Sequence, residues 1–174
     1  MRKIIAITGT PGVGKSTLAK ILKSKGWAVL ELNRAVVRKK LYSGYDKKLK
    51  SYIADQRKIN KYVKLWIGKQ KNERIAVVSH LSHLLPTKLV SAVIVLRCSP
   101  IVLEKRLKKR KYSKIKIKEN MEAELVGVIS CEAKQKHSAV YEFDCTSSVN
   151  SAFSGTEKVF KGQKVKRKQI DWLV

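Results

Sequence analysis

Eight consecutive residues near the start of the sequence, Gly9–Ser16, have the types and spacing of a phosphate-binding loop. They read GTPGVGKS and follow the pattern G-x-x-x-x-G-K-[ST]. Glycines leave the backbone free to curve around phosphate oxygens with its N–H groups pointing inward, and the N-terminus of a following helix adds partial positive charge. In such a loop Lys15 reaches the β- and γ-phosphates and the Ser16 hydroxyl binds Mg²⁺. The pattern therefore predicts a site for a di- or triphosphate.

The loop alone does not name the reaction, because GTPases, ATPases and nucleotide kinases share it. A switch GTPase also needs a base-reading N-K-x-D stretch, which this sequence lacks. A phosphotransferase instead needs an acceptor pocket, together with a lid whose arginines close on the phosphates and exclude water. Residues 34–54 could form the acceptor lobe. Arg106 and Arg110, next to a predicted break at 111–113, fit the lid.

The elements around the loop predict how it is positioned. Residues 4–7 form a short β-branched run typical of a strand buried on both faces. Apolar residues recur at helical spacing over 16–25, Gly26 stands at the expected C-terminal cap, and 27–32 is a second strand. A strand, a helix and a strand within about 30 residues form a βαβ unit, which implies a parallel sheet.

The rest of the chain continues the alternation of strands and helices. Ser99 and Pro100 are typical of a helix start, and Thr146 and Ser147 could cap a last short helix. The further predicted elements are a helix over 55–71, strands over 75–78, 92–96 and 141–145, a helix from 100 to about 110, and one long helix from about 114 to 138. We therefore predict one domain over 1–174, a three-layer α/β sandwich of the P-loop NTPase type with a parallel five-stranded sheet.

The charge balance indicates a polyanionic partner. Thirty-nine Lys and Arg against 13 Asp and Glu give a net charge of +26. Nine of the fifteen residues from 104 to 118 and six of the eleven from 158 to 168 are basic, with Glu104 as the one acid among them. Nucleic acid fits best, because each neutralised phosphate releases counterions and strengthens binding. General basicity of the proteome is the plainer alternative, and an anionic membrane fits less well because the basic runs lack an apolar face.

The cysteines and the hydropathy pattern predict a cytoplasmic location. Cys98, Cys131 and Cys145 are odd in number and far apart, so they indicate neither a disulfide framework nor a zinc site. The apolar run near the start is too short for the core of a signal peptide, and no run is long enough to span a membrane. No membrane contact is expected.

Five motifs together resemble the adenylate-kinase-like ATPase family of archaea and eukaryotes. They are ITGTPGVGKST, LYSGYD, SHLSHLLP, VIVLRCSPIVLEKRLKKRKYSKIKIKENMEAE and IDWL, in this order along nearly the whole chain. In eukaryotes the family is tied to nuclear adenylate kinase activity and to late maturation of the small ribosomal subunit. The resemblance implies a nucleoside-monophosphate-kinase fold with an acceptor region at about 30–53, a short lid at about 109–119, and here a basic tail at about 161–174.

The resemblance also assigns roles to individual residues. It places His80 near the reaction centre, although a pair of loop histidines with His83 is the plainer interpretation and an H-x-x-H zinc site the weaker one. Arg110 would be the lid arginine that faces ATP, with Arg106 beside it. The phosphate contacts would be Gly12, Gly14, Lys15, Ser16 and Thr17, with Ser16 on Mg²⁺, and the acceptor side would include Tyr45, Asp46 and Asp55.

Two departures from the family pattern concern the metal and the acceptor. The predicted strand over 75–78 ends without the carboxylate that usually orients Mg²⁺ and its waters, since Val78 and Ser79 stand there. The basic residue expected in the acceptor region falls on Val37, with Arg34 and Arg38 as near substitutes. We therefore expect slow phosphoryl transfer in which Ser16 is the one protein ligand of Mg²⁺.

Two functions follow as expectations. The first is an adenylate kinase that converts ATP and AMP, or another nucleoside monophosphate, to two diphosphates, with accompanying ATPase activity. The second is an ATP-gated assembly factor that contacts small-subunit ribosomal RNA and a small-subunit ribosomal protein and has residual kinase activity. A kinase for another small metabolite is a distant third.

Overall fold

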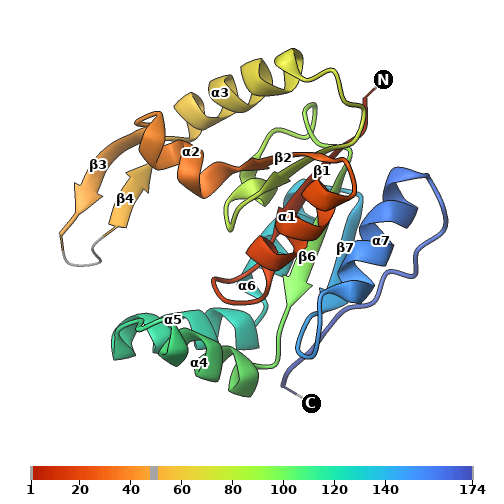
Figure 1. Cartoon of the computed structure of the whole chain (residues 1–174). Helices are drawn as coiled ribbons and strands as arrows, with labels where there is room; N and C mark the ends of the chain where they lie inside the picture. Colours follow the sequence, from red (N-terminus) through yellow and green to blue (C-terminus); the bar gives the residue numbers. More distant parts are fainter. Residues whose placement is uncertain (1, 48–50, 174) are drawn as a thin grey trace.

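The computed structural model describes residues 2–47 and 51–173, and its centre is a parallel sheet of five strands. The strand order is β2-β5-β1-β6-β7, and each neighbouring pair is parallel (Figure 1). The strands are β1 (Ile4–Thr8), β2 (Ala28–Glu31), β5 (Ile75–Val78), β6 (Ala92–Arg97) and β7 (Val140–Asp144). The predicted α/β class with a five-stranded parallel sheet is therefore confirmed.

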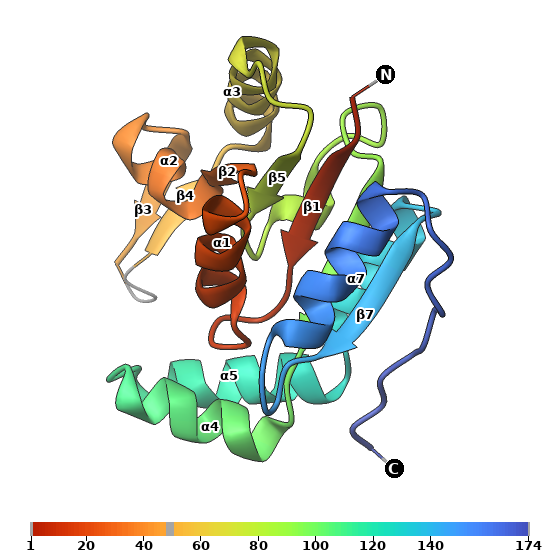
Figure 2. The ribbon, with the colours of Figure 1, turned by 45° about the vertical axis from the view of Figure 1, so that its right-hand side comes forward.

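The middle strands are buried because their apolar side chains alternate between two cores, one on each face of the sheet. On β1, Ile5 and Ile7 point into the first core, which α1 (Lys15–Ser24) and α7 (Asn150–Phe160) cover. Ile4 and Ala6 point into the second core, covered by α3 (Gln56–Lys69) and α6 (Val128–Lys136). Figures 1 and 2 show these helices on the two sides of the sheet, the predicted three-layer arrangement.

The predicted excursion at 34–54 contains elements that the sequence pattern did not resolve. Helix α2 (Leu32–Arg38) follows β2 directly, and an antiparallel hairpin of β3 (Tyr42–Asp46) and β4 (Ser51–Ala54) follows α2. The hairpin extends away from the main sheet on the side where α4 (Pro100–Lys109) and α5 (Lys114–Leu125) lie (Figures 1 and 2). Tyr52 packs against Tyr42 and Tyr45, with ring centroids 4.3 and 5.2 Å apart.

The prediction of one long helix from about 114 to 138 is wrong. Helix α4 (Pro100–Lys109) and a turn are followed by α5 (Lys114–Leu125), and α6 begins only at Val128. Gly127 separates α5 from α6 in a left-handed conformation with φ 66°. A β-carbon at Gly127 would lie 3.2 Å from the Arg97 guanidinium, so the break gives that buried cation room to approach.

The prediction that Thr146 or Ser147 caps the last helix is also wrong. Helix α7 begins at Asn150 after Val149, without a side-chain cap. The Thr146 hydroxyl instead accepts a hydrogen bond from the Ser99 N–H (2.9 Å) and donates to Asp144, which joins the start of α4 to the end of β7. These bonds fix the loop after β7 to the N-terminus of α4.

The segment after α7 has no regular secondary structure, and it runs back along β7 toward the carboxyl edge of the sheet (Figure 2). The Arg167 guanidinium lies 5.2 Å from the centroid of the Tyr141 ring and donates to the Ser138 carbonyl. Among the described residues, no helix is long and apolar enough to cross a membrane.

Candidate active site

The loop between β1 and α1 has the glycine-dependent backbone of a phosphate-binding loop. Gly9, Gly12 and Gly14 have φ of 136°, 98° and 120°, values that L side chains rarely adopt. A β-carbon on Gly9 would lie 2.4 Å from the Leu96 carbonyl oxygen, and one on Gly14 would lie 2.7 Å from a Val149 methyl group. Glycine is therefore required at these positions both for conformation and for space.

Lys15, the first residue of α1, lies buried beneath this loop. Its Nζ donates hydrogen bonds to the carbonyl oxygens of Gly9 (2.5 Å) and Thr10 (2.9 Å). Burial lowers the pKa of the ammonium to about 7; the Glu124 carboxylate partly opposes this shift, and the Arg110 guanidinium adds to it. An anion at the loop would favour the charged form, so ligand binding and protonation of Lys15 are coupled.

Two cavities flank the loop and share Gly12, Gly14 and Arg110. The larger, about 590 Å³, extends from the loop to the segment after β7 and is also lined by Thr17, Arg106, Lys109, Cys145, Ser147, Ser148 and Val149. The smaller, about 190 Å³, lies toward α2 and is also lined by Pro11, Lys15, Ser16, Asn33, His80 and Tyr112. The arrangement offers two compartments that meet at one phosphate-binding loop.

The two lid arginines lie in different positions relative to the loop. Arg106 on α4 donates from Nη1 to the Gly12 carbonyl (3.5 Å) and from Nη2 to the Cys145 (3.1 Å) and Thr146 (2.7 Å) carbonyls. It thus ties the phosphate-binding loop to the loop after β7. Arg110, at the C-terminal cap of α4, lines both cavities. The Arg110 guanidinium is therefore placed to contact a phosphoryl group that is transferred from one cavity to the other.

His80 and His83 have separate surroundings. His80 lines the smaller cavity, and burial together with the positive Lys15 lowers its pKa to about 4, so the ring is neutral at pH 7. The buried His83 ring contacts the Thr8 hydroxyl (3.0 Å) through Nδ1 and the Glu132 carboxylate (2.8 Å) through Nε2. Both His83 nitrogens are thus engaged. In residues 2–47 and 51–173 no group of three or more His, Cys, Asp and Glu side chains could hold a metal ion.

The oxygen donors around Ser16 fit a magnesium ion that keeps most of its ligands as water and phosphate. The smaller cavity brings Ser16 and Asn33 together, and its lining contains no carboxylate. At the end of β5 the Ser79 hydroxyl donates to Asn33 Oδ1 (2.6 Å), where a Walker-type carboxylate would otherwise stand. Mg²⁺ in kinase sites is commonly held by one or two carboxylates plus substrate phosphates and keeps several waters, so here water and phosphate oxygens would take the places of the carboxylates. Ser16 would be the direct protein ligand.

The structure does not bring all the predicted acceptor residues to these cavities. Arg34 and Arg38 line a different cavity, whereas Asn33 lies in the smaller one. Asp55 is the N-cap of α3 and accepts hydrogen bonds from the N–H groups of residues 57 (3.0 Å) and 58 (3.1 Å). Tyr45, about half exposed, and Asp46 belong to the hairpin strand β3.

Sequence reasoning missed Asn33 and Glu124, whereas Tyr112, which lines the smaller cavity, belongs to the predicted lid break at 111–113. Asn33 had a usable signal, because it follows β2 directly and the carboxyl ends of parallel strands are where α/β proteins bind ligands. Glu124 also had one, since it lies seven residues after the buried Ile117 on the apolar face of α5.

Glu124 is the centre of a buried ionic cluster beneath the phosphate-binding loop. It is 2% exposed, and its Oε2 accepts a hydrogen bond from the Thr10 hydroxyl (2.6 Å). Its Oε1 accepts from Arg97 Nε (2.8 Å) and from Trp172 Nε1 (3.3 Å). Arg97 Nη1 also donates to Glu142 (3.1 Å) and to the carbonyl of Ile170 (2.9 Å). The cluster joins the loop, the end of β6 and the segment after α7.

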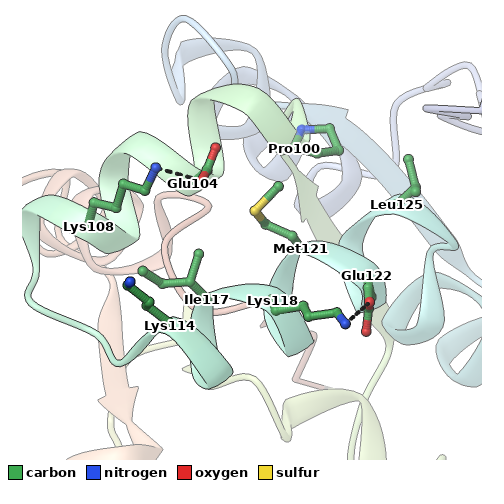
Figure 3. Close-up of a pocket in the computed structure, with 9 residues that line it drawn as sticks. All are labelled: Pro100, Glu104, Lys108, Lys114, Ile117, Lys118, Met121, Glu122 and Leu125. Atoms are coloured by element: carbon green, nitrogen blue, oxygen red, sulfur yellow. Dashed lines mark ion pairs between the residues drawn. The ribbon is translucent and has the colours of Figure 1, made fainter.

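A further groove of about 480 Å³ lies between α4 and α5 and contains no residue of the phosphate-binding loop. Its apolar side chains are Pro100, Ile117, Met121 and Leu125, and the ion pairs Glu104–Lys108 and Lys118–Glu122 lie at its rim (Figure 3). Because it contains no residue of the phosphate-binding loop and four of its five charged side chains are paired with each other, we assign it no part in the chemistry.

Comparisons with known proteins agree with this geometry. The model of a family described as "AAA domain" matches residues 5–127. A protein of Methanocaldococcus jannaschii named "Putative adenylate kinase" is 39% identical over 170 residues, which cover 97% of this chain and 92% of the relative. A protein of Pyrococcus abyssi with the same name is 40% identical over 146 residues, covering 83% of this chain and 76% of the relative.

Solved structures with low sequence identity share the fold. TT1252 from Thermus thermophilus superposes with a TM-score of 0.63 at 16% identity and covers 94% of this chain and 98% of its own. Shikimate kinase from Bacteroides thetaiotaomicron gives a TM-score of 0.59 at 12% identity, with coverages of 91% and 96%. The phosphate-binding loop, the strand order and the archaeal relatives together show that the chain belongs to the AAA domain family and, within it, to the archaeal adenylate-kinase-like group.

Proposed function

We propose that the protein is a nucleoside monophosphate kinase of the adenylate kinase type, which converts ATP and AMP to two ADP. The observation that carries this proposal is the pair of cavities that share Gly12, Gly14 and Arg110. A donor nucleotide in the larger cavity would place its phosphates on the loop, and an acceptor phosphate would enter from the side of Asn33 and His80. The names of the archaeal relatives support the same reaction.

In this reaction a phosphate oxygen of AMP attacks the γ-phosphorus of ATP, and the bond between that phosphorus and the β,γ-bridging oxygen breaks. Negative charge gathers on the transferring group and on the departing ADP. Lys15, once charged, and Arg110 would stabilise it, and the fold would hold donor and acceptor in line. A bound Mg²⁺ would neutralise phosphate charge, with Ser16 as its protein ligand. Neutral His80 would serve as a hydrogen-bonding group and not as a cation.

A coupled assay of ADP formation from Mg-ATP tests this proposal. It is run with and without each nucleoside monophosphate, with Lys15→Ala as the blank. Strong stimulation by AMP is the expected result. If ADP forms at a slow rate that no monophosphate changes, the kinase proposal is wrong.

A second candidate is an ATP-gated assembly factor that binds small-subunit ribosomal RNA and a small-subunit ribosomal protein and has only residual kinase activity. The observation that favours it is the excess of basic side chains, most of them exposed, over 104–118 and 158–168. Such contacts would run through phosphates and depend little on sequence. ADP release that ribosomal RNA or a ribosomal protein accelerates, and RNA binding that weakens steeply with salt, are expected. Binding that is insensitive to salt would refute the RNA contact.

A further inference from the structure

A third polar cavity, of about 280 Å³, lies outside the site described above. It is enclosed by the C-terminal half of α1, by β2, and by the helices α2 and α3. Lys23 lines it from the last turn of α1, whereas the phosphate-binding loop precedes the first turn. Lys23 follows Lys15 by eight residues, about 12 Å along α1, and on α2 Arg34 lines this cavity whereas its neighbour Asn33 lines the smaller cavity at the loop. The side chains that line it are Lys23, Leu30, Glu31, Arg34, Ala35, Arg38, Lys39, Tyr62 and Trp66.

The charges around the cavity favour an anion. Its lining has four basic side chains and one carboxylate, Glu31, which leaves a net charge of +3 (four minus one). Glu31 forms ion pairs with Lys23 and with Arg34 (3.4 Å), and these cations, with Lys20 nearby, hold its pKa below the ordinary value. Within the described part of the chain, Arg38 and Lys39 form no ion pair and are exposed. Two cations are therefore available for phosphate.

Two aromatic side chains, Tyr62 and Trp66, also line this cavity. Tyr62 and Trp66 are four residues apart on α3, so they lie on the same side of the helix. Each is only partly buried and packs against the second core, which fixes the ring while leaving part of it open to the cavity. A fixed aromatic ring beside exposed cations is the combination with which proteins hold single-stranded nucleic acid, because the ring stacks on a base and the cations track the phosphates.

We propose that this cavity binds one nucleotide unit of a single-stranded nucleic acid, with the base against Trp66 and Tyr62 and the phosphates at Arg38 and Lys39. A strand fits better than a free nucleotide because positive charge continues beyond the cavity: Lys20 lies one helical turn before Lys23 on α1. The inference rests on the second candidate function, for which it adds a contact site beyond the basic stretches 104–118 and 158–168.

The test measures binding of the full-length chain to a labelled single-stranded RNA oligonucleotide by fluorescence anisotropy over a range of salt concentrations. Arg38→Ala is compared with Arg57→Ala, which removes the same charge from an exposed position on α3 outside the cavity. We expect Arg38→Ala to weaken binding at least fivefold and to reduce the slope of log K against log salt by about 0.7, the value for one phosphate contact to a single strand. Trp66→Leu should weaken binding about tenfold.

Three other outcomes of this binding test would each overturn the inference. If RNA binds but Arg38→Ala and Trp66→Leu behave like Arg57→Ala, the cavity is not the contact, while the second candidate function stands. If the unmodified chain binds no RNA, both fail and the kinase proposal is untouched. If Arg38→Ala raises the KM for AMP and leaves RNA binding unchanged, the cavity is an acceptor-nucleotide site and the inference is wrong. Thermal melting of Trp66→Leu, with Tyr62→Leu as a second variant, shows whether loss of binding is loss of fold.

Discussion

The buried Lys15 ammonium makes nucleotide binding depend on pH near neutrality. In the free protein, burial lowers its pKa to about 7 from an ordinary value of about 10.5. Polyphosphate at the loop would stabilise the charged form and return the pKa toward the ordinary value or above it. Binding therefore takes up a proton wherever the free protein has lost one, which is at pH above about 7. The affinity for nucleotide is therefore highest below this pH and decreases as the pH rises above it.

The magnitude follows from the protonated fraction of the free lysine. With a pKa of about 7, this fraction is about one half at pH 7, about one eleventh at pH 8 and about one hundredth at pH 9. The association constant for Mg-ATP should thus fall about fivefold from pH 7 to 8 and about tenfold more by pH 9. Uptake should rise from about 0.5 proton per site at pH 7 to nearly one at pH 8.5, a range in which the phosphates themselves are ionised.

Isothermal titration calorimetry in two buffers of different ionisation enthalpy measures the proton uptake directly. Lys15→Arg is the matched control, because a guanidinium stays charged throughout this range and whatever affinity the variant retains should not depend on pH. An unchanged association constant between pH 7 and 9, together with no proton uptake at pH 8, would refute the reasoning. Such a result would mean that Lys15 is already fully charged in the free protein.

Three further predictions concern stability and turnover. Glu124→Gln should reduce the free energy of unfolding in urea by about 3 kcal/mol, because it removes one of the two buried carboxylates that pair with Arg97, whereas the exposed Glu122→Gln should change it by less than about 0.5 kcal/mol; equal effects would contradict the buried cluster. Gly155→Ala should destabilise the protein by about 1–3 kcal/mol, because its β-carbon would lie 2.0 Å from the Phe143 ring on β7. Gly68→Ala meets open space and should stabilise α3 by about 0.5 kcal/mol. Thermal melts in which Gly155→Ala is the more stable variant would disprove the packing around Gly155. Val78→Asp should raise turnover many-fold with unchanged affinity for ATP, if the missing carboxylate is what slows the reaction; unchanged turnover in the coupled assay would count against that idea.

Local sequence patterns were enough to predict the sheet and the loop. Ile4–Thr8 is apolar and β-branched, and the glycine-rich turn follows it at once, so both the buried strand and the phosphate-binding loop could be identified from adjacent residues. The helix over Gln56–Lys69 was predicted within two residues at each end, because its apolar side chains recur at helical spacing.

What the sequence could not predict depends on contacts between distant residues. Gly127 interrupts a continuous apolar periodicity, and the reason, the approach of Arg97, is visible only in three dimensions. Arg34 and Arg38 follow Asn33 by one and five residues, so they lie on another side of α2 and line another cavity. Without the bounds of α2, the sequence does not tell which of these residues share a side of the helix. The roles of Tyr45 and Asp46 stay a prediction.

The cluster around Glu124 sets an order of events during synthesis. Thr10 and Trp172 are 162 positions apart, and both donate to the same carboxylate. Domains fold as their N-terminal parts emerge from the ribosome, and contacts across long sequence separations form slowly. The phosphate-binding loop is therefore synthesised long before the last of the contacts around Glu124 can form. A chain folded only as far as β7 holds this loop without one of the hydrogen bonds beneath it, so the nucleotide site is fully supported only after Trp172 has joined the cluster.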